Sequence, residues 1–163
     1  MPRRDSQLQR EIKQQRPFRN SAQEAVVGLL RTADVARQQL TEALAPRGLT
    51  LQQYNVLRIL RGAGEQGLPT LDIAERMIER APGITRLLDR LEAKGLVRRV
   101  RCPEDRRQVL CWPTPDALDL LASLDDLTDR TDRAIVANLR NQDLIELIRL
   151  LDRVRAASEP TGG

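Results

Sequence analysis

The sequence predicts a mainly α-helical protein that carries one small β-hairpin. Over most of the chain the apolar side chains recur at helical spacing, so each helix would bury one face. Only three residues are aromatic (Phe18, Tyr54 and Trp112), so Leu, Ile, Val and Ala must form the core, which suits packed helices better than a sheet sandwich. The period changes at Leu96–Arg101 and Gln108–Trp112, which indicates two strands joined by a turn.

Length and charge indicate a single domain with an affinity for polyanions. A chain of 163 residues with 40% apolar content can bury a core of its own. Residues 1–20 and residues 54–113 each carry an excess of four positive charges, whereas residues 114–163 carry an excess of four negative ones. A basic stripe confined to one part of the chain is typical of a surface that attracts nucleic acid.

The composition argues against an enzyme. The chain has no histidine, which is both the commonest metal ligand and the usual general base near neutral pH. Cys102 and Cys111 are too few for a metal cage or a disulfide framework. We therefore expect no catalytic residue, no metal and no cofactor. The absence of a long apolar run and of a secretory signal predicts a cytoplasmic protein that does not contact membranes.

The first part of the chain contains an arm and a long helix. Residues 1–19 are rich in Gln and Arg and predict a flexible basic arm, although an extended helix fits the same pattern. Ser21 and Glu24 are spaced as a capping box, in which each side chain satisfies the other residue's backbone donor. Pro46 and Gly48 would end the helix that follows.

Two shorter helices are expected next. Thr50 and Gln53 repeat the capping-box spacing, and the glycines that begin at Gly62 would end that helix. Thr70 would cap a helix of two turns, with Ile73 on its buried face.

The next helix leads directly into the hairpin. Pro82 suits its first position, and Gly95 suits the left-handed conformation that ends a helix. Two short helices followed by an arginine-rich hairpin form the outline of a winged helix-turn-helix. The apolar side of the second helix consists of Ile84, Leu87, Leu88 and Leu91.

Two further helices complete a predicted total of six. Thr114, Pro115 and Asp116 form a strong helix start, and Asn141 would cap the last helix. The narrow apolar stripe from Leu144 to Val154 and a similar face near the N-terminus predict dimerisation through the terminal helices. The expected domain spans residues 20–158, with a winged helix-turn-helix lobe at 50–113, dimerisation helices at 20–45 and 114–158, and a tail at 159–163.

The second helix of the motif carries side chains that can read DNA. Such a helix enters the major groove with its N-terminal half near the base edges. Thr85 can contact a phosphate or a thymine methyl group, and Arg86 can contact guanine. Gly83 would allow close approach of the backbone, and Arg90 lies on the same side. An ordinary solvated helix face would carry similar residues, so this motif alone leaves both interpretations open.

The hairpin favours DNA binding over that alternative. Asp105 lies two residues before Arg107, so its carboxylate could hold that guanidinium extended toward a minor groove. A hairpin kept soluble by its charges is the competing interpretation. The remaining candidate DNA contacts on the wing are Arg98, Arg99, Arg101 and Arg106.

The run LPTLDIAERMIERAPGITRLLDRLEAKGLVRRVRCPEDRRQVLCWPT resembles the MarR family of winged-helix regulators. The match consists of Thr-Arg-Leu-x-Asp-x-Leu-x-x-x-Gly-Leu from Thr85 to Leu96 and of the Asp-x-Arg wing at Asp105 to Arg107. The resemblance continues less specifically from Phe18 to Arg155. It implies a homodimer that binds a pseudo-palindromic operator in double-stranded DNA, represses transcription and is associated with the nucleoid while bound.

The resemblance has two departures and also suggests a ligand. Arg80-Ala81-Pro82 stands where many members have a serine cap, so base preferences cannot be transferred, and Ala117 replaces a glycine found after the wing. Members commonly bind small phenolic or anionic effectors in a cleft beside the DNA-binding lobe. Arg31 and Tyr54 are candidates to line such a pocket, although both also fit ordinary surface or core-edge positions.

Two alternative functions stay open. A redox-responsive regulator could use Cys102 and Cys111, but a turn centred near Asp105 would place them opposite Gln108 and Arg99 rather than opposite each other. Inert thiols are the stronger interpretation, because redox sensors of this family place a reactive cysteine near the first helix, where this chain has none. A winged-helix module that binds proteins instead of DNA is the second alternative.

Overall fold

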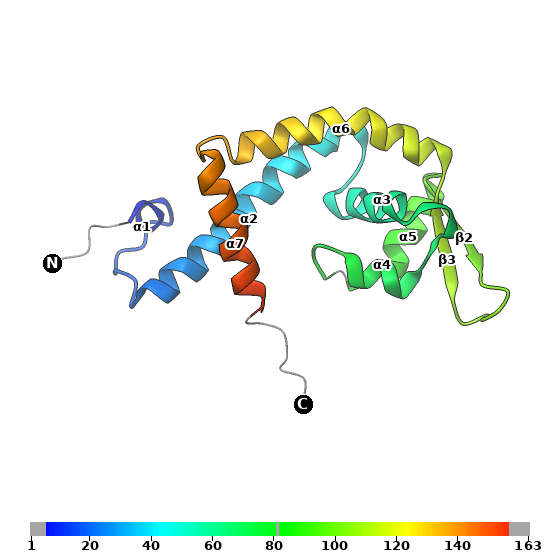
Figure 1. Cartoon of the computed structure of the whole chain (residues 1–163), viewed down its shortest axis with the longest axis horizontal. Coiled ribbons are helices and arrows are strands. Elements are labelled where there is room, and N and C mark those ends of the chain that lie inside the picture. Colours follow the sequence, from blue (N-terminus) through cyan, green and yellow to red (C-terminus); the bar gives the residue numbers. More distant parts are fainter. Residues whose placement is uncertain (1–5, 81, 157–163) are drawn as a thin grey trace. The chain divides into compact units, whose positions relative to one another are not determined.

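The computed structural model describes residues 6–80 and 82–156, so the predicted tail and the first residues of the arm lie outside the described part of the chain. The chain forms two compact units, Met1–Leu51 and Gln52–Gly163 (Figure 1). None of the helices in the described ranges combines the length and apolar composition that a bilayer crossing requires.

The first unit contains a short helix within the residues that were predicted to form a flexible arm. This helix, α1 (Gln7–Glu11), is capped by Ser6, whose hydroxyl accepts from the backbone N–H of Gln9 at 3.2 Å. Leu8 packs against α2 at Gly28, where a Cβ atom would lie 3.4 Å from the leucine methyl group. Part of the predicted arm therefore forms a short helix of its own, and this helix does not extend α2.

Helix α2 (Ser21–Leu44) begins one residue away from the predicted cap. The cap is Asn20, whose carboxamide oxygen accepts from the N–H of Gln23 at 2.8 Å. Gln23 in turn accepts from the N–H of Arg19 at 2.8 Å, so a reciprocal pair exists but not the Ser21–Glu24 capping box. The helix is followed by the 3-10 turn η1 (Ala45–Arg47), which contains the proline expected to end it.

The second unit contains most of the helices and the sheet. The described residues of the whole chain form seven α-helices, of which five belong to the second unit, whereas the sequence predicted six. The core of the second unit is mainly aliphatic, as the scarcity of aromatic residues required. Its helices are α3 (Leu51–Ala63), α4 (Thr70–Arg76), α5 (Ile84–Ala93), α6 (Pro115–Ile135) and α7 (Asn141–Ala156). The first residue of α3 is the last residue of the first unit. The 3-10 turn η2 (Gly64–Gln66) follows α3. The fully buried side chains include Leu57, Leu60, Ile73, Leu88, Leu91, Leu121 and Leu124.

The sheet has three antiparallel strands in the order β1-β3-β2. The hairpin strands β2 (Val97–Arg101) and β3 (Val109–Pro113) lie within one residue of their predicted bounds. Strand β1 (Leu68–Pro69) was not predicted, and it pairs Leu68 with Cys111. The hairpin is therefore attached to the segment that leads into α4.

The caps of the last two helices follow the sequence signals in part. The Thr114 hydroxyl accepts from the N–H of Ala117 at 3.2 Å and donates to the carbonyl of Gly95 at 2.7 Å, which confirms the predicted start of α6. At the start of α7, Asn141 is itself helical. The carboxylate of Asp143 accepts from the N–H of Arg140 at 3.2 Å, so the residue before the helix is bonded to its first turn, and Asn141 is not the cap that the sequence predicts.

Candidate nucleic-acid interface

Helices α4 and α5 and the turn between them form the helix-turn-helix. The prediction that Pro82 is the first residue of α5 is wrong, because Pro82 lies in the turn and Gly83 occupies the cap position with a φ of 93°. Ala81 lies outside the described residues. Thr70 is the first residue of α4 rather than its cap, and its hydroxyl donates to the carbonyl of Val109 at 3.4 Å.

Helix α5 separates a buried side from an exposed one, as its sequence predicts. Leu87, Leu88 and Leu91 are buried, while the side chains of Thr85, Arg86 and Arg90 are exposed. Among the described residues, no hydrogen bond or ion pair engages the guanidinium group of Arg86 or of Arg90. This face is therefore available to a ligand.

Gly95 ends α5 as predicted. Its φ of 70° allows the N–H of Gly95 to reach the carbonyl of Glu92 at 2.8 Å and the N–H of Leu96 to reach that of Leu91 at 2.9 Å. This pair of bonds satisfies two of the carbonyls at the helix end and turns the chain directly into β2.

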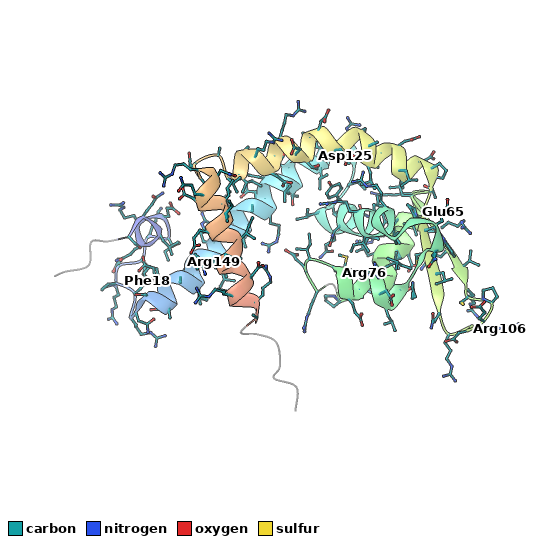
Figure 2. All side chains as sticks on the ribbon, viewed as in Figure 1. Phe18, Glu65, Arg76, Arg106, Asp125 and Arg149 are labelled. Atoms are coloured by element: carbon teal, nitrogen blue, oxygen red, sulfur yellow. The ribbon has the colours of Figure 1, made fainter. Side chains whose placement is uncertain are left out.

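The tip of the wing is held by its backbone. The Asp105 carboxylate accepts from the backbone N–H of Arg107 at 3.0 Å, and the N–H of Gln108 donates to the carbonyl of Asp105 at 2.9 Å. The expected contact of Asp105 with the Arg107 guanidinium is replaced by this turn. Figure 2 shows Arg106 at the tip of the hairpin, and both arginine side chains there are exposed.

Arg99 connects the wing to α5. Its Nη2 lies 2.5 Å from Oε2 of Glu92 and 2.6 Å from Oδ1 of Asp89, and only 20% of its side chain is exposed. The hydrogen bond to Glu92, supported by Asp89, raises the pKa of Arg99 despite its partial burial. Arg99 was predicted to follow phosphates, but here it neutralises two carboxylates of α5.

Arg98 has a different partner on the other face of β2. Its guanidinium lies 4.4 Å from the centroid of the Trp112 ring, within the range of a cation–π contact. The indole Nε1 donates to the carbonyl of Glu65 at 2.9 Å, so the ring is fixed between the wing and the loop after α3. Among the described residues, Arg101 is the one arginine of β2 whose side chain has no hydrogen bond, ion pair or ring contact.

A pocket of about 330 Å³ lies where α4, α5 and the wing meet. Thr85 of α5 and Arg107 of the wing both line it, so the two predicted DNA-contacting elements border one hollow. The sequence did not predict this pocket, because it depends on the unpredicted pairing of β1 with β3. Its polar lining includes Thr70, Asp72, Arg99 and Gln108.

The two candidate effector contacts belong to different units. Arg31 lies on α2, where its guanidinium is 3.8 Å from the carboxylate of Asp34. Tyr54 lies on α3 and is 6% exposed, and its hydroxyl donates to the hydroxyl of Thr128 on α6 at 3.2 Å. Tyr54 thus has a role in the core of the second unit.

Both cysteines are buried and unpaired. Arg99 lies opposite Cys111, and the N–H of Cys102 donates to the carbonyl of Gln108 at 2.9 Å, so the predicted register is confirmed. Burial raises the pKa of Cys111 and disfavours its reactive thiolate.

Comparison with known proteins places this geometry in a family. The family model described as MarR family matches residues 49–109. A MarR transcription factor from Planctomyces limnophilus is 40% identical in sequence, and the match covers 83% of this chain and 98% of that one with a TM-score of 0.65. The chain belongs to the MarR family. MarR proteins such as these relatives are transcription regulators, not enzymes.

One further relative matches part of the chain in sequence, and one further solved structure shares its fold. The HTH-type transcriptional regulator TtmR of Methylorubrum extorquens is 40% identical over 84 residues, which are 52% of this chain and 42% of that protein. The chain thus spans less than half the length of this curated relative. A mutant of Escherichia coli MarR complexed with operator DNA is 24% identical and shares the fold, with a TM-score of 0.76 over 85% of this chain and 99% of that one.

Proposed function

We propose that this protein is a sequence-specific, DNA-binding transcriptional regulator that acts as a homodimer. The observation that carries the proposal is the exposed face of α5 beside a wing whose tip carries Arg106 and Arg107. In a winged helix-turn-helix these two elements contact adjacent grooves of one duplex. Family membership and the operator complex of Escherichia coli MarR support the same conclusion.

Each exposed side chain has a role in this proposal. Thr85 and Arg86 lie in the first turn of α5 and would contact base edges in the major groove, with Arg90 on a phosphate. Gly83 would let the backbone approach the duplex, since a Cβ atom there would meet nothing within 4 Å. Arg106 and Arg107 would enter the minor groove, which attracts arginine when it is narrow.

The terminal helices support a dimer. Helix α7 has no buried residue in this monomeric structure, and Ile145 and Ile148 are more than 60% exposed. On α2, Leu30 is 66% exposed. Burying such faces against a second copy of the chain removes apolar surface from water, and a two-fold dimer would place its α5 helices about 34–36 Å apart.

We extend the proposal to repression that a small phenolic or anionic effector relieves. Family membership supports this step, and Arg31 on α2 stays a candidate contact. The redox-responsive alternative using Cys102 and Cys111 has less support, because both thiols are buried.

Selection of bound sequences from a random duplex pool tests the proposal. We expect a palindromic consensus whose binding weakens steeply with salt, because phosphate contacts release counterions. Arg107→Ala should weaken binding, whereas Arg133→Ala removes an equal charge from α6 and should not. A flat salt dependence would favour a protein-interaction module, and unchanged binding by Arg107→Ala would contradict the role of the wing.

The effector is tested on the selected operator. Phenolic and anionic compounds should release the protein from the duplex at constant salt. If a broad panel of such compounds releases none of it, the effector part of the proposal is wrong and DNA binding is unaffected.

A further inference from the structure

Three consecutive polar residues near the start of α3 are buried and bonded to three different elements. Gln53, Tyr54 and Asn55 are 4%, 6% and 8% exposed, and we call them the α3 polar row. Burying a polar side chain is costly unless it is hydrogen-bonded. Each of the three bonds therefore fixes one element against α3.

Asn55 holds the turn that leads into α5. Its carboxamide oxygen accepts from the backbone N–H of Ile78 at 2.9 Å, two residues after the end of α4. The Ile78 side chain is 80% exposed and contributes little packing. Helix α5 also has no side-chain cap of its own among the described residues. The bond to Asn55 therefore fixes one point of the segment that leads into α5.

Gln53 holds the other end of α5. Its side-chain oxygen accepts from Nζ of Lys94 at 3.2 Å, and Lys94 is the residue that closes this helix. One turn of α3 therefore contacts the chain both before and after α5. The packed helices α3, α4 and α5 and the long helix α6 are seen in Figure 1.

Tyr54 connects the same turn to α6. Its hydroxyl donates to Thr128 Oγ1 at 3.2 Å, and that hydroxyl donates in turn to the carbonyl of Leu124 at 3.0 Å. Thr128 is 7% exposed, so the bond is shielded from water. Helix α6 leads into α7, which carries an apolar face of the proposed dimer.

We infer that the α3 polar row sets the orientation of α5 relative to α6, and that Tyr54 and Asn55 are positioning residues for DNA recognition. This inference rests on the proposed function. In a dimer, the direction of each α5 relative to the dimerisation helices determines which half-site spacing both can occupy. If a bond of the row is lost, α5 samples several orientations and only a fraction of molecules matches the operator.

The experiment compares duplexes whose half-site spacing differs. From the selected operator, a series is made in which the central spacer is lengthened or shortened by one base pair. We expect the wild-type protein to prefer one spacing. Thr128→Val and Tyr54→Phe should each reduce this preference about tenfold, the equivalent of one hydrogen bond of about 1.4 kcal/mol.

Matched variants separate positioning from general damage. Thr128→Ser keeps the hydroxyl and should keep the spacing preference. The double variant Tyr54→Phe/Thr128→Val should lose no more of the spacing preference than either single variant, because both changes remove the same hydrogen bond. Asn55→Leu removes the acceptor for Ile78 and should also reduce the preference. None of these changes alters charge, so non-specific affinity and its salt dependence should stay constant.

The outcomes distinguish the two levels of the argument. If the wild-type protein binds without any spacing preference, the proposed dimer is wrong. If the wild type has the preference and Thr128→Val and Tyr54→Phe keep it in full, the positioning role is overturned. A parallel loss of specific and non-specific binding would also overturn it, because that result indicates loss of the fold.

Discussion

Gly67→Ala should destabilise the protein strongly, because the backbone and the packing both require glycine there. Gly67 follows η2 with a φ of 69° and a ψ of 177°, a conformation that costs a residue with a side chain about 1–3 kcal/mol. A Cβ atom would lie 2.4 Å from Cε2 of Trp112. No contact at that distance is tolerated, so the indole or the loop must move.

The indole is not free to move. Its Nε1 donates to the carbonyl of Glu65, and Arg98 stacks on its ring. Displacing a packed ring costs about 1–3 kcal/mol. Adding this cost to the backbone strain, we expect Gly67→Ala to lower the free energy of unfolding by about 2–6 kcal/mol.

Urea denaturation measures this loss. Trp112 is the sole tryptophan of the chain, so its fluorescence reports the wing, and we expect the mutant emission to shift toward that of exposed indole. Gly62→Ala is the matched control, because Gly62 lies within α3 and a Cβ there would meet nothing within 4 Å. The control should gain up to about 1 kcal/mol. A Gly67→Ala protein within about 0.5 kcal/mol of wild type would refute the reasoning.

Three further changes have expected outcomes. Thr114→Ala should lower the free energy of unfolding by about 1–2 kcal/mol, because α6 loses its cap. Thr114→Ser keeps the hydroxyl and should keep the stability. An equal loss in both variants would contradict the capping role. Burial raises the pKa of Cys111, so as pH rises the thiol ionises first in the unfolded chain. The contribution of Cys111 to the free energy of unfolding should therefore be constant below the ordinary thiol pKa of about 8.5. It should fall as pH rises from there through the higher pKa of the folded protein. Cys111→Ala should show a smaller fall in urea titrations at pH 7 to 10, and identical pH profiles would contradict this. Ile148→Lys should yield monomers in sedimentation measurements, and an unchanged dimer would exclude this face.

The sequence predicted those parts of the fold that depend on neighbouring residues. The start of α6 at Thr114 and the end of α5 at Gly95 are local events, because the bonding partners lie within a few residues. The two hairpin strands were predicted within one residue for the same reason. The cap of α2 was misplaced by one residue, because Asn20 and Ser21 are both good caps and only the backbone decides between them.

The parts that were not predicted depend on partners distant in the sequence. Strand β1 has two residues and no period of its own, so it exists only through its pairing with β3. The role of Arg99 depends on two carboxylates that lie across the turn into β2, and an arginine in a charged hairpin gives no local signal of such a pair. The α3 polar row has no pattern in the sequence, because its three partners come from three elements.

The sheet order has a consequence for association. The central strand is β3, so only β1 and β2 present edges. Strand β1 offers two residues, and Pro69 among them has no N–H to donate, whereas β2 is lined with arginines. Neither edge can easily accept a strand from another molecule, because a short or strongly charged edge opposes such pairing. Copies of this protein therefore have little opportunity to join through their wings, and helices are left as the route to assembly.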